Sequence, residues 1–181
     1  MHSGMGMGKD PTAARTRHRG GSHPVMVAAA VAVITLAGCG NCGSSATAAR
    51  RAEVEARGAT IMPFDLQRTT HVFRSDATGG VQLVVAKDPH DEVQIALVRA
   101  HLRREARRFA SGNFTDPMAI HGMTMPGIAR LRLGFDRIDV TFATLRRGAR
   151  IRYATTEAAL VTALHDWFDA QLTDHGAHAR G

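Results

Sequence analysis

The residues best suited to bind a ligand lie in one short segment, residues 116–127, with the sequence DPMAIHGMTMPG. Its prolines and glycines disfavour a helix, so we expect an extended chain. Residues two apart in an extended chain share a face, and His121, Met123 and Met125 would therefore point the same way. One imidazole and two thioethers form a soft ligand set that suits Cu(I). The segment predicts a copper site, and the alternative is that its methionines fill gaps in the core.

Three further histidines are candidates to complete this site: His71, His101 and His165. His71 opens an expected strand, and the other two lie beside the apolar stripes of two expected helices. Their matching places in the two halves of the domain could bring His101 and His165 together. Glu105, four residues after His101, could orient that imidazole as a metal ligand, although a buried histidine paired with a carboxylate is more common. The tail histidines, His175 and His178, are expected to lie in a frayed terminus.

The sequence carries none of the common enzyme signatures. G-x-S-x-G, H-E-x-x-H, the Walker A loop and G-x-G-x-x-G are all missing. Asp88 and Asp91 are explained as capping acids of a helix that opens with Asp88 and Pro89. The sequence therefore favours non-enzymatic ligand binding, and an uncharacterised enzyme is the weaker alternative.

The N-terminal quarter has the three parts of a secretory signal peptide. Residues 1–24 are polar and basic, residues 25–38 carry no charge, and Leu-Ala-Gly-Cys ends at Cys39. The apolar run of 14 residues is shorter than the ~20 residues that a helix needs to cross a bilayer. The final tetrapeptide resembles the lipobox of bacterial lipoproteins, whose cysteine is acylated. We expect cleavage before Cys39 and acyl chains such as palmitate on it, which makes the membrane one partner.

The residues around this cysteine refine the expected location. Gly40 stands where lipoproteins of the inner membrane often carry Asp, which favours the outer membrane and a periplasm-facing protein. Cys42 is the only other cysteine, and the C-x-x-C spacing alone does not complete a zinc site. The domain that follows contains no cysteine, so it must be stable without disulfides.

The charge balance is modestly basic. The whole chain has a net charge of +7, and residues 1–38 carry four basic side chains and one acid, which leaves a net charge of +4. No basic run is interleaved with aromatic residues, so binding to nucleic acid is not expected. A basic surface close to anionic lipid headgroups is the simpler explanation.

The patterning of the remaining chain repeats one order of elements. Strand-like stretches with alternating or continuous apolar residues are 71–74, 81–86, 138–142 and 151–153. A helix is expected after each pair of strands, ending near Ala110 in the first half and beginning near Thr155 in the second. This ββα-ββα order predicts an α+β two-layer sandwich, an antiparallel sheet backed by two helices. An irregular linker, residues 114–135, is expected between the halves.

These patterns divide the chain into four parts. We expect a signal peptide over residues 1–38, a lipidated tether over 39–58, an α+β domain over 59–174 and a flexible tail over 175–181. The tether is rich in Gly, Ser, Ala and charged residues, with at most a helical turn near residues 48–57.

Four segments carry a resemblance to known proteins: ATIMPFDLQRTTHVF from residue 59, GGVQLVVAKD from 79, IHGMTMPG from 120 and LHDWFDAQLTDHG from 164. They resemble a group of short exported bacterial proteins often labelled aspartate carbamoyltransferase, over about residues 53–178. The resemblance implies the limits of the domain. It does not imply carbamoyl transfer, because the Ser-x-Arg-Thr phosphate loop and the His-Pro-x-Gln segment of those enzymes are missing.

The function expected from the sequence is that of a membrane-anchored periplasmic lipoprotein that binds a ligand, with copper as the most specific version. The alternative is a structural or protein-interaction domain whose histidines and methionines only pack.

Overall fold

Two β-hairpins form the sheet of the domain. The structure, a computed structural model, describes residues 42–181, so the expected signal peptide and Cys39 lie outside the described residues. The first hairpin is β1 (Thr69–Asp76) with β2 (Gly79–Ala86), and the second is β3 (Asp139–Leu145) with β4 (Gly148–Ala154). Antiparallel pairing of β2 with β4 joins them, and the short β5 (Ala179–Arg180) pairs in parallel with β1. The strand order is β3-β4-β2-β1-β5.

The first hairpin depends on a glycine where β2 begins. Gly79 has a φ of +138°, a conformation that residues with a Cβ rarely adopt. A Cβ at this position would lie 2.4 Å from the carbonyl oxygen of Tyr153 on β4. The start of β2 therefore approaches β4 so closely that only glycine fits.

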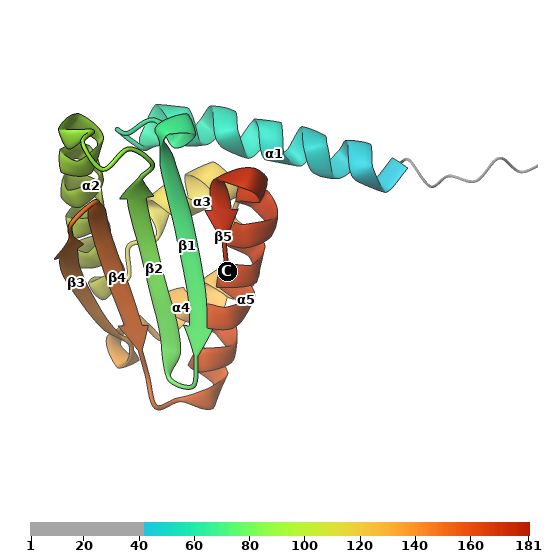
Figure 1. The fold of residues 1–181 in the computed structure, drawn as a ribbon. Helices are drawn as coiled ribbons and strands as arrows, with labels where there is room; N and C mark the ends of the chain where they lie inside the picture. Colours follow the sequence, from blue (N-terminus) through green and yellow to red (C-terminus); the bar gives the residue numbers. More distant parts are fainter. Residues whose placement is uncertain (1–41) are drawn as a thin grey trace, which may run out of the picture. The chain divides into compact units, whose positions relative to one another are not determined.

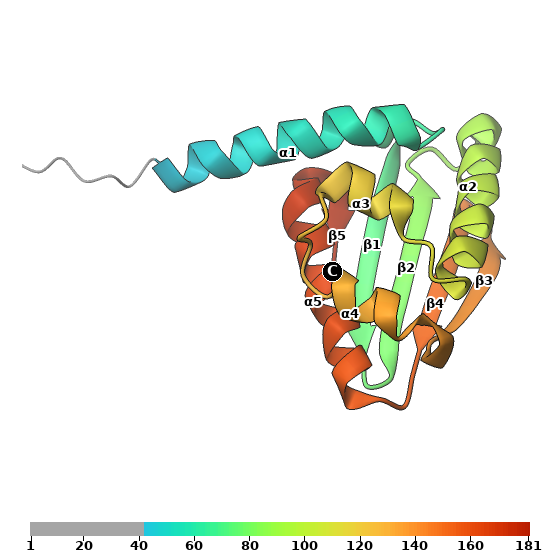
Figure 2. The ribbon, with the colours of Figure 1, turned by 180° about the vertical axis from the view of Figure 1, so that it is seen from behind.

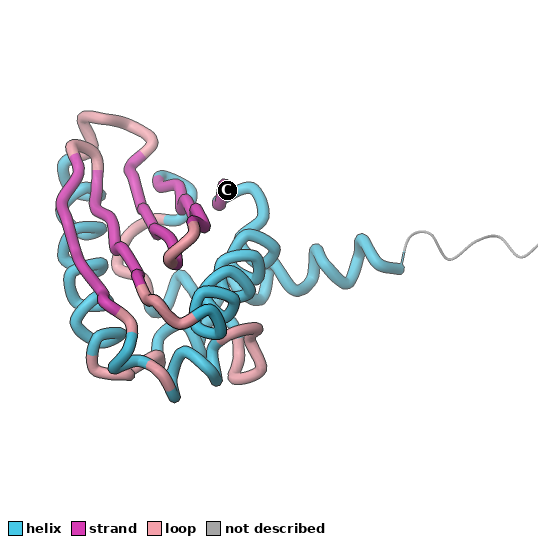
Figure 3. Tube along the Cα trace, turned by 90° about the horizontal axis from the view of Figure 1, so that it is seen from below, coloured by secondary structure: helices cyan, strands magenta, loops and turns pink. Residues whose placement is uncertain are grey.

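Two long helices, one after each hairpin in the chain, cover the same face of the sheet (Figures 1 and 2). The helix α2 (Glu92–Ala110) packs on β3 and β4, and α5 (Ala158–His175) packs on β1 and β2. Seen from below, the strands gather in one layer with helices packed beside it (Figure 3). The predicted α+β two-layer sandwich is confirmed, with the addition that β5 makes the sheet mixed.

The core lies between the sheet and these two helices. Residues that alternate along the strands point inward, among them Phe73, Ile151 and Tyr153, all nearly inaccessible to solvent. Trp167 and Phe168 of α5 meet them, and the Tyr153 and Trp167 rings pack edge to face with centroids 5.5 Å apart. Burial of such large rings is the main stabilising contribution in a domain of this size.

The N-terminal end of the described chain differs from the expected tether. Residues Cys42–Ile61 form one helix, α1, built largely from strong helix formers such as Ala, Arg and Glu. It packs against α3 and α5, and the side chain of Val54 is only 1% exposed. The expected boundary at residue 59 is therefore too late, because the core already includes residues of α1.

The linker also differs from expectation, because it contains two short helices, α3 (Thr115–His121) and α4 (Ile128–Leu133). Pro117 lies in the first turn of α3, where backbone N–H groups have no partner within the helix, so the proline removes no hydrogen bond. Gly122, with a φ of +92°, ends α3 and donates its N–H to the carbonyl of Met118. The rule that proline excludes a helix does not apply within a first turn.

The C-terminal residues are ordered against β1. Residues Gly176–His178 form a 3-10 turn, and Ala179 of β5 pairs with His71. The expected flexible tail over residues 175–181 is therefore wrong for this structure, because a backbone ladder fixes its end.

Candidate functional site

Four histidines from four different elements line one small interior cavity of about 40 Å³. They are His71 of β1, His101 of α2, His121 of α3 and His175 of α5. Each residue is at most 8% exposed. Charged and polar side chains are rarely buried together without a specific reason, so this cavity is the leading candidate for a functional site.

The rings are close to one another. His71 and His175 are stacked with centroids 4.8 Å apart and planes 6° apart. His121 meets His175 edge to face at 5.0 Å. Phe64 completes the group, because its ring contacts both His71, at 5.8 Å, and His101, at 5.4 Å.

His121 is held by a carboxylate. Its Nδ1 lies 2.8 Å from Oδ2 of Asp174, and the same carboxylate accepts hydrogen bonds from Nε and Nη2 of Arg50 at 3.1 and 2.7 Å. Burial lowers the pKa of His121 even though the contact with Asp174 acts in the opposite direction. Burial raises the pKa of Asp174, but its hydrogen bonds from Arg50 and His121 outweigh this, and the net direction is down. The pair is therefore a neutral imidazole that donates from Nδ1 to a carboxylate, which leaves a lone pair on Nε2.

Burial also keeps the other three imidazoles neutral. It lowers the pKa of His71 to about 3 and that of His101 to about 4, and it holds the pKa of His175 well below its ordinary value. Nδ1 of His101 lies 2.8 Å from a nitrogen of Arg104, so this ring accepts at Nδ1 and carries its proton on Nε2. All four imidazoles are therefore uncharged near neutral pH, the form in which imidazole binds metals.

A carboxyl group shares the cavity. Glu105 of α2 lines it, and burial followed by a hydrogen bond with Asp116 raises the pKa of Glu105 to about 7. Two arginine contacts to Glu105, at 3.6 and 3.7 Å, act against this shift. Arg108 lies closer to Asp116, at 2.7 Å, than to Glu105. We therefore assign the negative charge to Asp116 and the proton to Glu105.

Three buried polar atoms at the cavity have no hydrogen-bond partner among the described residues. These are Nδ1 of His71, Oε1 of Glu105 and Nε1 of Trp167. An unsatisfied buried polar atom costs about 1–3 kcal/mol. The cavity has room for one water molecule or one ion, and either could satisfy these atoms.

The structure brings together three of the six histidine and methionine residues that the sequence singled out. His71, His101 and His121 line the cavity, whereas His165 lies elsewhere. Nε2 of His165 is 3.0 Å from the carbonyl oxygens of both Asp76 and Gly79, at the turn of the first hairpin. The expected pairing of His101 with His165 is therefore wrong, since the two helices place these rings at different ends of the sheet.

The two methionines are also separated from the histidines. Because α3 continues through His121, the extended segment that would align three side chains does not form. Met123 is 73% exposed and Met125 is 5% exposed, so they do not share a face. A different thioether, that of Met62, lines the cavity.

The fourth cavity histidine, His175, was assigned by sequence to the frayed tail. The sequence does contain a pattern that places His175 in the core. Positions 168, 171 and 175 continue the buried stripe of α5 at helical spacing. The expected domain ends at residue 174, one residue before His175, and so excludes this histidine from the candidate site.

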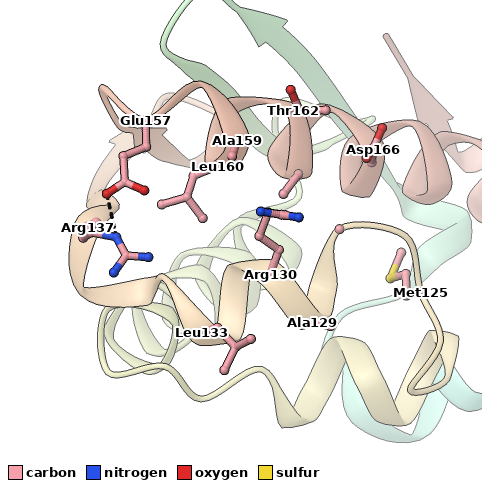
Figure 4. Close-up of a pocket in the computed structure, with 12 residues that line it drawn as sticks. Met125, Ala129, Arg130, Leu133, Arg137, Glu157, Ala159, Leu160, Thr162 and Asp166 are labelled. Carbon is pink, nitrogen blue, oxygen red and sulfur yellow. Dashed lines mark ion pairs between the residues drawn. The ribbon is translucent and has the colours of Figure 1, made fainter.

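Two larger hollows lie at the surface near the cavity. One, of about 560 Å³, is lined by Arg50, His121, Met125 and Asp174 among others. His121 also lines the interior cavity, so its ring lies between the cavity and this hollow. The other, of about 760 Å³, lies between α4 and α5 and holds no histidine (Figure 4). An ion pair of 2.6 Å between Arg137 and Glu157 lies at one end of it, and Arg130 and Asp166 line it together with apolar side chains.

Among residues 42–181, no group of three or more His, Cys, Asp or Glu side chains is already arranged around a single metal position. A metal ion in the cavity would require some of the rings to turn. Within the same part of the chain, no helix has the length and apolar character needed to span a membrane.

No protein-family model, no curated protein and no solved structure matches this sequence.

Proposed function

We propose that this chain is an exported bacterial lipoprotein, anchored by acyl chains on Cys39 in the outer membrane and facing the periplasm, whose domain binds a transition-metal ion without catalysing a reaction. The anchor is supported by the sequence of residues 25–39. Metal binding is supported by one observation above all, the convergence of four buried, neutral imidazoles on one cavity.

Metal binding would explain features that a purely structural core does not need. Neutral imidazole is the commonest metal ligand in proteins. A ligating histidine usually donates its second nitrogen to a carboxylate or carbonyl, as His121 does to Asp174. The unpaired Nδ1 of His71 supplies a second available nitrogen.

The parallel stacking of His71 and His175 limits how the ion is held. A metal ion lies in the plane of each imidazole that binds it, so two parallel rings cannot both point at one ion. We therefore expect one of these rings to turn out of the stack on binding.

The ligand set favours copper or zinc. Imidazoles accept both metals, and a thioether favours Cu(I). Met62 lines the cavity, so the copper proposal from sequence is retained with Met62 in place of Met123 and Met125.

Titration of the full-length protein with Cu(I), Cu(II) and Zn(II) tests this proposal, with elemental analysis of the protein as isolated. We expect one tightly bound ion per chain, and His71→Gln combined with His175→Gln to weaken binding by about 100-fold or more. His165→Gln is the matched control, since that ring lies at the hairpin turn, and it should bind as the wild type does.

Circular dichroism shows whether the double variant folds. If it does not, His101→Gln alone replaces it in the comparison. Wild-type protein that binds neither metal, or variants that bind as the wild type does, would favour the alternative of a structural or interaction domain whose cavity holds water.

A further inference from the structure

One face of the sheet is covered by no described helix (Figure 1). A further hollow, with an unusual charge, lies on that face. Its volume is about 370 Å³. Four cationic side chains line it, those of Arg74, Lys87, Arg147 and Arg180, and no Asp or Glu side chain does. Its floor is formed by Thr70, Val72 and Val85.

The strand register places these cations together. Along β1, residues 70, 72 and 74 point away from the face that carries His71 and Phe73. β5 runs parallel to β1 and pairs Arg180 with Val72, so Arg180 lies on the same open face as Arg74. Lys87 directly follows β2, and its Nζ donates to the carbonyl of Gln67 at 2.8 Å, which fixes the ammonium at the rim.

These cations lack the partners that other arginines of the domain have. Elsewhere in residues 42–181, carboxylates pair with arginines in Arg50–Asp174, Arg68–Asp91, Arg108–Asp116, Arg137–Glu157 and Arg152–Asp76. No described carboxylate forms an ion pair with any of the four cations of the hollow. Gly181, which ends the described chain, also lines the hollow. The four cations repel one another, and an anion in the hollow would relieve this repulsion.

We propose that this hollow binds a phosphate-bearing ligand. The planar guanidinium matches two phosphate oxygens at once, and the ammonium adds a point charge. The hydroxyl of Thr70 offers one further donor, and the two valines of the floor offer apolar contact to the organic part of the ligand. This site is separate from the histidine cavity, which lies on the other face of the sheet. The result of a test of one proposal therefore does not affect the other.

Two sources could supply such a ligand, a soluble phosphorylated compound or the headgroup of an anionic lipid. Isothermal titration of the full-length protein in a non-ionic detergent distinguishes them, with pyrophosphate and short-chain phosphatidylglycerol as probes. Short-chain phosphatidylcholine, which carries no net charge, is the control ligand. We expect at least one anionic probe to bind more tightly than phosphatidylcholine, with an affinity that falls as salt is added.

The variant Arg74→Gln combined with Arg180→Gln should weaken that binding about tenfold or more. Its matched control is Arg130→Gln combined with Arg132→Gln, which removes the same charge from the exposed surface of α4 and should change the affinity less than twofold. The four replaced side chains are all exposed, those of Arg74, Arg180, Arg130 and Arg132. Both double variants should therefore fold.

Tighter binding of pyrophosphate would identify a soluble phosphorylated compound, and tighter binding of phosphatidylglycerol would identify a lipid headgroup. The proposal is overturned if neither probe binds at low salt, or if the two double variants lose affinity equally.

Discussion

At the scale of single residues, the candidate site depends on how each imidazole is oriented. His121 is fixed by Asp174 and His101 by Arg104, whereas Nδ1 of His71 has no partner among the described residues. The sequence identified three of the four cavity histidines: His71 and His101 lie in or beside apolar patterns, and His121 is singled out by its spacing from two methionines. It could not show that Met123 turns to solvent, since that depends on where α3 ends.

Replacement of Asp174 by Asn tests the orientation of His121. The variant loses the charge that holds both His121 and Arg50, so we expect metal affinity to fall about 10- to 100-fold and the free energy of unfolding to fall by about 1–3 kcal/mol. Metal titration and urea unfolding measure the two effects. Asp169→Asn, an exposed position on the same helix, is the control, and equal losses in both variants would contradict the assigned role of Asp174.

The glycine at the start of β2 makes a second prediction at this scale. Gly79→Ala places a methyl group against the carbonyl of Tyr153 in a backbone conformation that alanine avoids. We expect a loss of roughly 2 kcal/mol or more in the free energy of unfolding. Gly43→Ala meets open space within α1 and should be neutral or slightly stabilising. Similar stability of the two variants would show that the hairpin is less constrained than described.

At the scale of elements, the sequence predicted the strands and the two long helices because their periodic patterns are local. The pattern of β1 and β2 and the stripes of α2 and α5 are visible without knowledge of the fold. The helix α1 was expected only as a turn within a tether. The short elements α3 and β5 were missed for two reasons. The residue type of Pro117 does not reveal that it lies in the first turn of a helix, where proline is tolerated. The strand β5 forms only because β1 offers a free edge.

The helix α1 gives the prediction for this scale. Val54 is 1% exposed, so Val54→Ala should lower the free energy of unfolding by about 1–3 kcal/mol through lost apolar burial. Val93→Ala removes the same atoms from an exposed position on α2 and should change stability by less than ~0.5 kcal/mol. Denaturant unfolding of both variants makes the comparison. If Val54→Ala leaves the free energy of unfolding unchanged, residues 42–58 form a loose tether and not part of the core.

At the scale of the whole molecule, the domain combines a buried histidine cavity on the helix-covered face of its sheet with a basic hollow on the open face. The basic hollow gathers four of the basic side chains that give the chain its positive charge. The composition predicts a net positive charge. The place where basic side chains gather depends on the strand register, which the sequence alone does not provide.

The stability of the metal-free protein should depend on pH in a defined direction. The folded state lowers the pKa of His71 to about 3 and that of His101 to about 4, from 6.5. The unfolded chain therefore binds protons more readily, so the stabilisation is complete above about pH 6.5 and is lost as the pH falls toward 4. Glu105, with its pKa raised from 4.5 to about 7, acts in the opposite sense, and its contribution is lost as the pH rises through 7.

The histidines outnumber the single glutamate, so we expect a net loss of at least ~2 kcal/mol between pH 7 and pH 5. Urea unfolding of the metal-free protein at the two pH values measures it. His71→Gln combined with His101→Gln should reduce this dependence. Stability that is equal at both pH values would mean that these rings are hydrated and not buried as described.

Anomalous diffraction from crystals grown with copper, and separately with zinc, tests metal binding in the cavity most directly. The account predicts an anomalous peak within the cavity, with nitrogens from at least three of its four histidines around the ion: His71, His101, His121 and His175. A peak only at surface histidines such as His90, or no peak in crystals whose cavity density fits a water molecule, would contradict it.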